Sequence, residues 1–271
     1  MLQMKNISFS YDERQTLHDI SMDFAEGQIT GILGANGSGK STIMKLMTCL
    51  LKPQEGSLLY DGQPVSYSKK ALYQYRQHVN MVFQNPEQQL FYTIVKDDIG
   101  MALENLGYEE DQIASRVSAA LEMMDISHLQ DRPLQYLSYG QKKRVAIAGM
   151  LALQPKYLLL DEPTAGLDPK GRDQMAQTMK KLVQAGTNII VSSHDMDLMY
   201  DCCDYAYLLQ KGNLIAQGSK FELFQQGELL AEAGVSVPWI VKLHQTIQTP
   251  LAENEAAFFE QLGGSVRWSN H

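Results

Sequence analysis

Short apolar runs alternate with helix-like segments along most of the chain. Four of these runs predict buried strands, because they are brief and lack the polar alternation of a half-exposed strand: residues 29–33, 79–83, 157–160 and 188–192. The first, third and fourth lead directly into residues suited to phosphate or metal chemistry. Since open α/β sheets bind ligands at the carboxyl ends of their strands, the pattern predicts an α/β fold with its site at one sheet edge.

The amino-terminal and middle segments follow different patterns. Residues 1–11 and 17–30 alternate apolar and polar positions, which predicts a small antiparallel sheet. Residues from about 87 to 154 have a helical pattern, with an amphipathic stretch at 113–124 and an apolar helix at 145–153. The α/β core is therefore expected to carry an amino-terminal β-subdomain and an inserted α-helical subdomain.

The chain changes character after about Gly218, where helical segments follow one another and a break is expected at Pro250. We expect residues 1–235 to form one domain and residues 236–271 a C-terminal helical extension.

Composition limits the function. The 271 residues carry a net charge of −8, and the acidic surplus disfavours general nucleic-acid binding, which needs basic groups for phosphate. No run approaches the roughly 20 apolar residues of a membrane helix, and the first residues do not form a signal peptide. A cytosolic location is expected, with reduced cysteines and with methionines such as Met44 and Met196 in core positions.

A glycine loop joins the first predicted strand to a helix. The segment Gly34-Ala35-Asn36-Gly37-Ser38-Gly39-Lys40-Ser41-Thr42 matches GxxxxGK[ST]. Its glycines allow backbone N–H groups to surround phosphates, and the helix that starts near Lys40 adds a positive dipole end. The motif predicts an ATP site in which Lys40 reaches the β- and γ-phosphates and Ser41 holds Mg²⁺.

Two adjacent carboxylates, Asp161 and Glu162, end another apolar strand. Adjacent strand residues point to opposite faces, so the two carboxylates are expected to have different tasks. Asp161 would hold Mg²⁺, and Glu162 would accept a proton from the attacking water.

Ser138 and Gln141 have the spacing of a capping box, so a helix is predicted to begin here. Its free N–H groups and the Ser138 hydroxyl can receive a phosphate. The glycine loop already has a helix amino terminus of its own, so this phosphate would belong to ATP on a second copy. The basic run 142–144 is expected to be a solvated face.

The segment Leu137-Ser138-Tyr139-Gly140-Gln141 resembles the LSGGQ signature of ATP-binding-cassette (ABC) ATPases, with Tyr139 in place of the first glycine. The resemblance covers about residues 1–235 and implies a phosphate-loop, RecA-like core. It also implies that Ser138, Gly140 and Gln141 contact ATP held by the second copy and that Tyr11 stacks on adenine. Gln84 would be the Q-loop glutamine and a Mg²⁺ ligand. Asp168 would lie in the D-loop, and His194 would be the switch histidine.

The motifs around Gln84, the signature and Asp161, together with VPWIVKLH in the tail, are similar to the ATPase subunits of energy-coupling-factor importers, above all the CbiO type of cobalt importers. This likeness implies a dimer with itself or a paralogous ATPase. It also implies a transmembrane coupling subunit, a substrate-capturing membrane subunit and a place on the cytoplasmic face of the membrane.

Other functions stay open. The substrate could be nickel or a vitamin instead of cobalt. An ABC ATPase acting on DNA or ribosomes would usually have two cassettes or long insertions. A phosphate-loop kinase would not need a signature helix, and Glu162 and His194 argue against a module that binds ATP without turnover.

Overall fold

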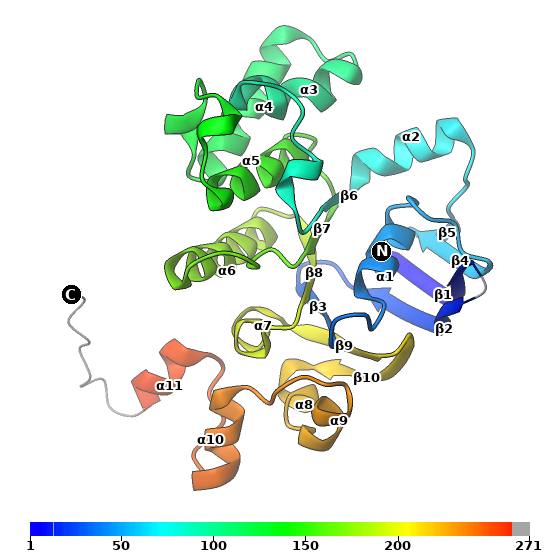
Figure 1. The fold of residues 1–271 in the computed structure, drawn as a ribbon, viewed down its shortest axis with the longest axis vertical. Coiled ribbons are helices and arrows are strands. Elements are labelled where there is room, and N and C mark those ends of the chain that lie inside the picture. Colours follow the sequence, from blue (N-terminus) through cyan, green and yellow to red (C-terminus); the bar gives the residue numbers. More distant parts are fainter. Residues whose placement is uncertain (13, 262–271) are drawn as a thin grey trace.

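The computed structural model describes residues 1–12 and 14–261. A six-stranded sheet forms its centre (Figure 1), and it is parallel except for one edge strand. All four predicted strands lie in this sheet, which confirms the α/β core. The order across the sheet is β10 (Asn213–Ser219), β9 (Tyr205–Gln210), β3 (Ile29–Leu33), β8 (Asn188–Ser193), β7 (Tyr157–Asp161) and β6 (Val79–Val82).

The sheet is apolar on both faces. Along β7, Leu158 and Leu160 pack into one buried cluster, whereas Tyr157 and Leu159 pack into another. A strand covered on both sides gains nothing from polar alternation, which explains why the strands appeared in the sequence as unbroken apolar runs. The methionines at 44, 47, 196 and 199 are buried in these clusters, and the three cysteines are free thiols.

A second, antiparallel sheet confirms the amino-terminal β-subdomain. It contains β2 (Arg14–Phe24), β1 (Leu2–Tyr11), β4 (Glu55–Tyr60) and β5 (Gln63–Pro64), in that order. Residues on β1 alternate between buried and more exposed positions, as predicted. The sequence pattern did not reveal β4 and β5, which return to this sheet after the glycine loop and its helix.

The inserted helical subdomain lies at the top of Figure 1, between β6 and β7 in chain order. Its helices α3 (Val95–Asn105), α4 (Glu110–Met123) and α5 (Tyr139–Leu151) pack on one another. Short 3-10 turns at Pro86–Gln88, Ser127–Leu129 and Leu134–Tyr136 connect them to the core and to each other. The core itself carries α1 (Lys40–Met47), α2 (Lys69–His78), α6 (Pro169–Gln184) and α7 (Met196–Cys202).

The chain ends in α8 (Lys220–Leu223), α9 (Gly227–Glu232), α10 (Trp239–Ile247) and α11 (Glu255–Gln261). The last two helices stand on either side of Pro250, where the break was predicted. Ile240, Val241 and Phe258 are buried in the same cluster as residues of α7, so the tail packs on the core. Residues 262–271 of the predicted extension lie outside the described part. None of the described helices is both long and apolar enough to cross a membrane.

Candidate functional site

The glycine loop, residues 34–42, connects β3 to α1 as predicted. Gly34, Gly37 and Gly39 have positive φ angles of 144°, 79° and 108°. A Cβ atom at Gly34 would lie 2.5 Å from the carbonyl oxygen of Leu209, so the close approach of the two backbones requires glycine there. The loop then leads into the first turn of α1, whose N–H groups are available for an anion.

The buried side chain of Lys40 points back over this loop. Its Nζ atom donates to the carbonyl oxygens of Gly34 at 2.8 Å and Ala35 at 3.1 Å. Burial lowers the pKa of Lys40, while the negative charges of Glu162 and Asp161 raise it. The ammonium is therefore poorly solvated and is held by carbonyl groups that can release it to a stronger anionic partner.

A cavity of about 380 Å³ lies beside the loop and brings together segments that are far apart in the sequence. The carboxyl ends of β3, β7 and β8 and the segment after β6 all contribute to it, in agreement with the expected position at one sheet edge. Its lining residues are Thr16, Asn36, Gly37, Gly39, Lys40, Ser41, Thr42, Gln84, Asp161, Glu162 and His194.

Three predicted ATP residues do not line this cavity. Gly34 forms the base of the loop, and Ser38 is buried with a hydroxyl that has no hydrogen-bond partner among the described residues. Tyr11 is exposed at the end of β1, where its ring packs edge-on against Phe9 at a centroid distance of 4.9 Å. Its ring is free to meet a planar group, and its role with adenine stays a prediction.

Asp161 and Glu162 both face the cavity, so the expectation that they point to opposite faces was wrong. The strand β7 ends at Asp161, and Glu162 has a φ angle of 48°, which turns its side chain back to the same side. Ser192 on the neighbouring strand holds both residues: its hydroxyl donates to Asp161 Oδ1 and accepts the Glu162 N–H at 3.2 Å. Strand alternation does not extend beyond the last ladder residue.

The Glu162 carboxylate lies close to the side chains of His194 and Lys40. The Nδ1 atom of His194 lies 3.0 Å from both of its carboxylate oxygens, and Lys40 Nζ lies 3.9 Å from Oε1. Glu162 is buried, whereas the His194 side chain is 57% exposed. The carboxylate is thus fixed at the cavity wall by a side chain that remains open to solvent.

The donor set suits a magnesium nucleotide. Ser41, Gln84 and Asp161 all line the cavity and offer hydroxyl, amide and carboxylate oxygens, and hard oxygen donors are what Mg²⁺ prefers. The glycine loop and Lys40 offer N–H donors and positive charge for phosphates. These residues fit ATP together with Mg²⁺.

The capping box at the start of α5 is confirmed. Ser138 Oγ accepts the Gln141 N–H at 3.3 Å, and Gln141 Oε1 accepts the Ser138 N–H at 2.9 Å. Asp168 caps α6 through one bond, by accepting the Gly171 N–H at 2.8 Å. Ser138, Gly140, Gln141 and Asp168 all line a second hollow of about 290 Å³, which shares no lining residue with the nucleotide cavity.

Lys143 is a residue that the sequence interpretation missed. Within the run 142–144, expected to be a solvated face, it is only 1% exposed, and its Nζ donates to the carbonyl oxygens of Glu162 at 3.0 Å and Ala165 at 3.1 Å. Burial lowers the pKa of Lys143 to about 8, against the opposing charges of Glu162 and Asp161. Lys143 therefore ties α5 to the end of β7. The sequence around Lys143 did not predict its burial, because the turn that its side chain contacts is distant in the sequence.

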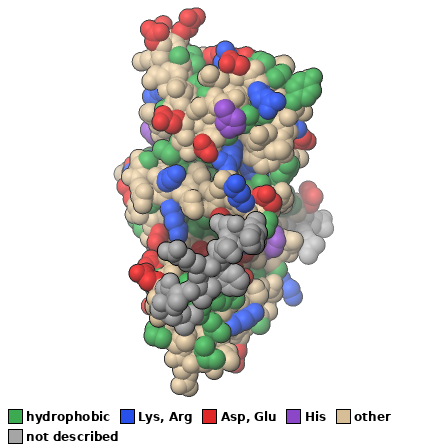
Figure 2. Space-filling view, turned by 90° about the vertical axis from the view of Figure 1, so that its left-hand side faces the viewer, with side chains coloured by type: hydrophobic (Ala, Val, Ile, Leu, Met, Phe, Trp, Pro, Cys, Tyr) green, Lys and Arg blue, Asp and Glu red, His purple; other side chains and the backbone are tan. Residues whose placement is uncertain are grey.

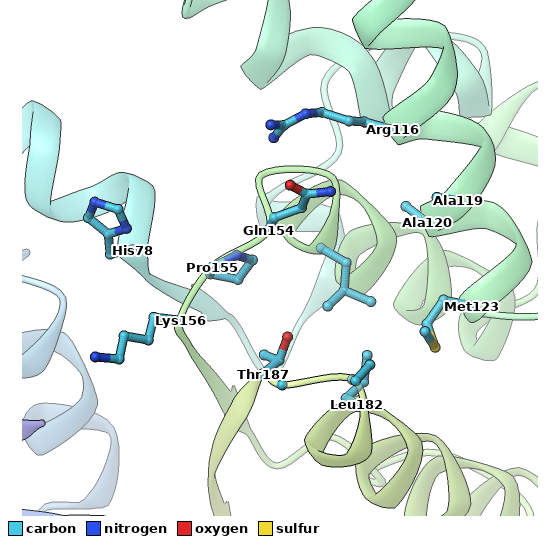
Figure 3. Close-up of a pocket in the computed structure, with 13 residues that line it drawn as sticks. His78, Arg116, Ala119, Ala120, Met123, Gln154, Pro155, Lys156, Leu182 and Thr187 are labelled. Atoms are coloured by element: carbon cyan, nitrogen blue, oxygen red, sulfur yellow. The ribbon is translucent and has the colours of Figure 1, made fainter. Parts of the chain in front are cut away.

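A larger cavity, of about 490 Å³, lies away from these motifs (Figure 3). Helix α4, the end of α6 and the loop before β7 form its walls, near the amino-terminal ends of β7 and β8. Its cationic residues already have partners: Arg116 donates to the Ala152 carbonyl, and Lys156 pairs with Glu26 at 2.7 Å.

Figure 2 shows acidic and basic side chains interspersed over one face of the molecule.

Comparisons with known proteins agree with the geometry. Residues 17–165 match the family model described as ABC transporter. The chain is 47% identical to the cobalt import ATP-binding protein CbiO of Salmonella typhimurium, over 97% of both chains. It is 38% identical to the energy-coupling factor transporter ATP-binding protein EcfA3 of Clostridium perfringens, over 97% of this chain and 91% of that one. The solved structure of CbiO1 from Clostridium perfringens, part of the cbiONQ transporter complex, is similar with a TM-score of 0.79 and 37% identity, covering 91% of this chain and 95% of that one.

Proposed function

The chain belongs to the ABC transporter family as an ATPase of the energy-coupling-factor type, and we propose that it hydrolyses ATP to drive the uptake of cobalt. The observation that carries the ATPase assignment is the convergence of Lys40, Glu162 and His194 on one cavity beside the glycine loop. The proposal for cobalt rests on the 47% identity to a cobalt import protein over nearly the whole chain.

In the proposed reaction, Glu162 takes a proton from a water molecule that attacks the γ-phosphorus. The bond from this phosphorus to the bridging oxygen breaks, and ADP and phosphate leave. His194 holds the Glu162 carboxylate in place through Nδ1, and Lys40 leaves the carbonyls of Gly34 and Ala35 to neutralise the phosphates. Ser41, Gln84 and Asp161 would hold Mg²⁺, which supplies charge neutralisation at the phosphate oxygens.

The placement of the signature residues supports a head-to-tail pair. Ser138 and Gly140 line a hollow separate from their own nucleotide cavity, so they are free to meet ATP held by another chain. We propose that the second chain is a copy of this one or a paralogous ATPase. In this pair each ATP lies between the glycine loop of one chain and the signature helix of the other.

The segment after Gln84 supports a peripheral position on the cytoplasmic face of the membrane. Phe91 is 70% exposed and Tyr92 is 45% exposed. Asp98 Oδ1 fixes this turn by accepting the N–H groups of Phe91 at 2.7 Å and Tyr92 at 2.8 Å. Two exposed aromatic rings on a turn that Asp98 fixes suit docking to a transmembrane coupling subunit, which would work with a substrate-capturing membrane subunit.

Selectivity is proposed to lie in those membrane subunits. Among residues 1–12 and 14–261, no group of three or more His, Cys, Asp or Glu side chains could hold a metal ion. This chain would therefore supply the energy without binding the transported ion.

Residues 236–271 are proposed to be an extension of the cassette, joined to it through the packing of α10 and α11.

Uptake of labelled cobalt by cells that lack this chain tests the proposal. The wild-type chain should restore high-affinity uptake, and the Glu162→Gln variant should not. Restoration of nickel or vitamin uptake, with cobalt unaffected, would redirect the substrate and leave the ATPase assignment intact. A tight cobalt site on the purified chain would contradict the placement of selectivity in the membrane subunits.

A further inference from the structure

Tyr139 occupies the position of a signature glycine, yet its side chain turns toward its own chain. Its hydroxyl donates to the carbonyl oxygen of Gln84 at 3.1 Å. Its ring lies against Gly166, where an added Cβ atom would be 3.0 Å from ring atom Cε1. One side chain on α5 thus contacts both the segment after β6 and the loop after β7.

These contacts place Tyr139 between two sites. Gln84 lines the nucleotide cavity of the same chain, whereas Ser138 and Gly140, which flank Tyr139, line the separate hollow. A shift of the Gln84 backbone would move the hydroxyl to which it is bonded. Because Tyr139 is the first residue of α5, that movement would be passed to the start of the helix and its capping box.

The Tyr139 side chain is 39% exposed, and its remaining surface contacts its own chain. Gly166 has a φ angle of 78°, and the absence of a side chain there leaves space for the ring. Lys143 Nζ lies 5.4 Å from the ring centroid while it anchors the helix to Glu162 and Ala165. The ring and the ammonium thus link the start of α5 to both loops.

We propose that Tyr139 is a positioning residue that couples nucleotide occupancy in its own chain to the placement of Ser138 and Gly140 for the ATP of the second chain. The inference rests on the head-to-tail pair of the proposed function. A single hydrogen bond sets its size, so the coupling is at most about tenfold in affinity.

The test measures ATP hydrolysis against ATP concentration for the purified wild-type chain, Tyr139→Phe and Tyr139→Gly. The wild-type chain should give a Hill coefficient above unity, because two linked sites respond together. Tyr139→Phe keeps the ring but loses the bond to Gln84. Its Hill coefficient should fall below the wild-type value, and its half-saturating ATP concentration should rise by up to about tenfold. Tyr139→Gly, which loses both contacts, should show the same loss.

Tyr136→Phe is the matched control. Tyr136 is 69% exposed, and its hydroxyl forms no hydrogen bond within the described part of the chain, so this variant should keep the wild-type Hill coefficient. The unfolding temperature of Tyr139→Phe should equal that of the wild type, which separates positioning from a structural effect.

The inference is overturned if Tyr139→Phe keeps the wild-type Hill coefficient, or if the wild-type coefficient is unity. The proposed function is assessed separately by wild-type turnover and by ATP-dependent pairing of Glu162→Gln. If both of these are seen and only the Hill coefficient fails to change, the coupling by Tyr139 is wrong and the function stands. If neither is seen, the function and the coupling fail together.

Discussion

His194 Nδ1 lies 3.0 Å from each carboxylate oxygen of Glu162, which places the imidazole across the carboxylate rather than at one end of it. Glu162 is buried at the cavity wall, and His194 stands at its open side. The general base proposed for hydrolysis is therefore positioned by a residue 32 positions later, on the neighbouring strand's carboxyl end.

Glu162→Gln should release phosphate about 10²–10⁴ times more slowly than the wild type, because the amide cannot take the proton of the attacking water. The variant should still bind ATP and should form a dimer with ATP that light scattering detects. Glu110→Gln, on the exposed first turn of α4, is the control and should hydrolyse ATP normally. Only monomers of Glu162→Gln in ATP would contradict the sandwich.

Lys40→Ala should weaken the binding of a fluorescent ATP analogue or abolish turnover. The change removes the only described ammonium that is held over the loop by Gly34 and Ala35, and with it the positive charge for the phosphates. Lys45→Ala, one turn further along α1, should bind the analogue as the wild type does. Normal hydrolysis by Lys40→Ala would disprove the assignment of the glycine loop.

Tyr200→Phe should lower the free energy of unfolding by about 1–3 kcal/mol, as measured by urea denaturation. The Tyr200 hydroxyl donates to the Ala252 carbonyl at 2.7 Å, and both residues are buried where α7 meets the tail. Removing the donor leaves a buried carbonyl without its partner. An unchanged stability, equal to that of Tyr136→Phe, would show that the tail is not held to α7 by this bond.

Asp98→Asn tests a pH dependence. Burial raises the pKa of Asp98 above its ordinary value of 3.8, against the opposing backbone N–H groups of Tyr92 and Phe91. The folded chain therefore keeps this proton to a higher pH than the unfolded chain, so the contribution of Asp98 to stability falls as the pH rises through its folded pKa. Urea denaturation at pH values from just below 3.8 upward should show that the wild type loses stability relative to Asp98→Asn. Parallel pH profiles would contradict the raised pKa.

The sequence by itself determined the buried strands and the identity of the loop that follows β3. A strand covered on both faces has to be apolar throughout, and a loop that approaches phosphate closely has to use glycine. Both features can therefore be predicted from the residues of the segment itself. The capping box of Ser138 and Gln141 was equally visible, because all its partners lie within one helical turn. The break at Pro250 was also predictable, because proline interrupts a helix through its own backbone.

Only the tertiary structure decided how these local parts meet. Strand alternation placed Glu162 opposite Asp161, whereas its positive φ angle brings both into one cavity. Lys143 appeared to be a surface charge until the packing of α5 on the end of β7 buried it, and the direction of Tyr139 depended on Gln84 and Gly166, which lie 55 and 27 residues away. Local sequence patterns predict the secondary structure that a residue favours in its own segment. Which distant group will satisfy a buried charge or hydroxyl is fixed only when the helical subdomain packs against the sheet.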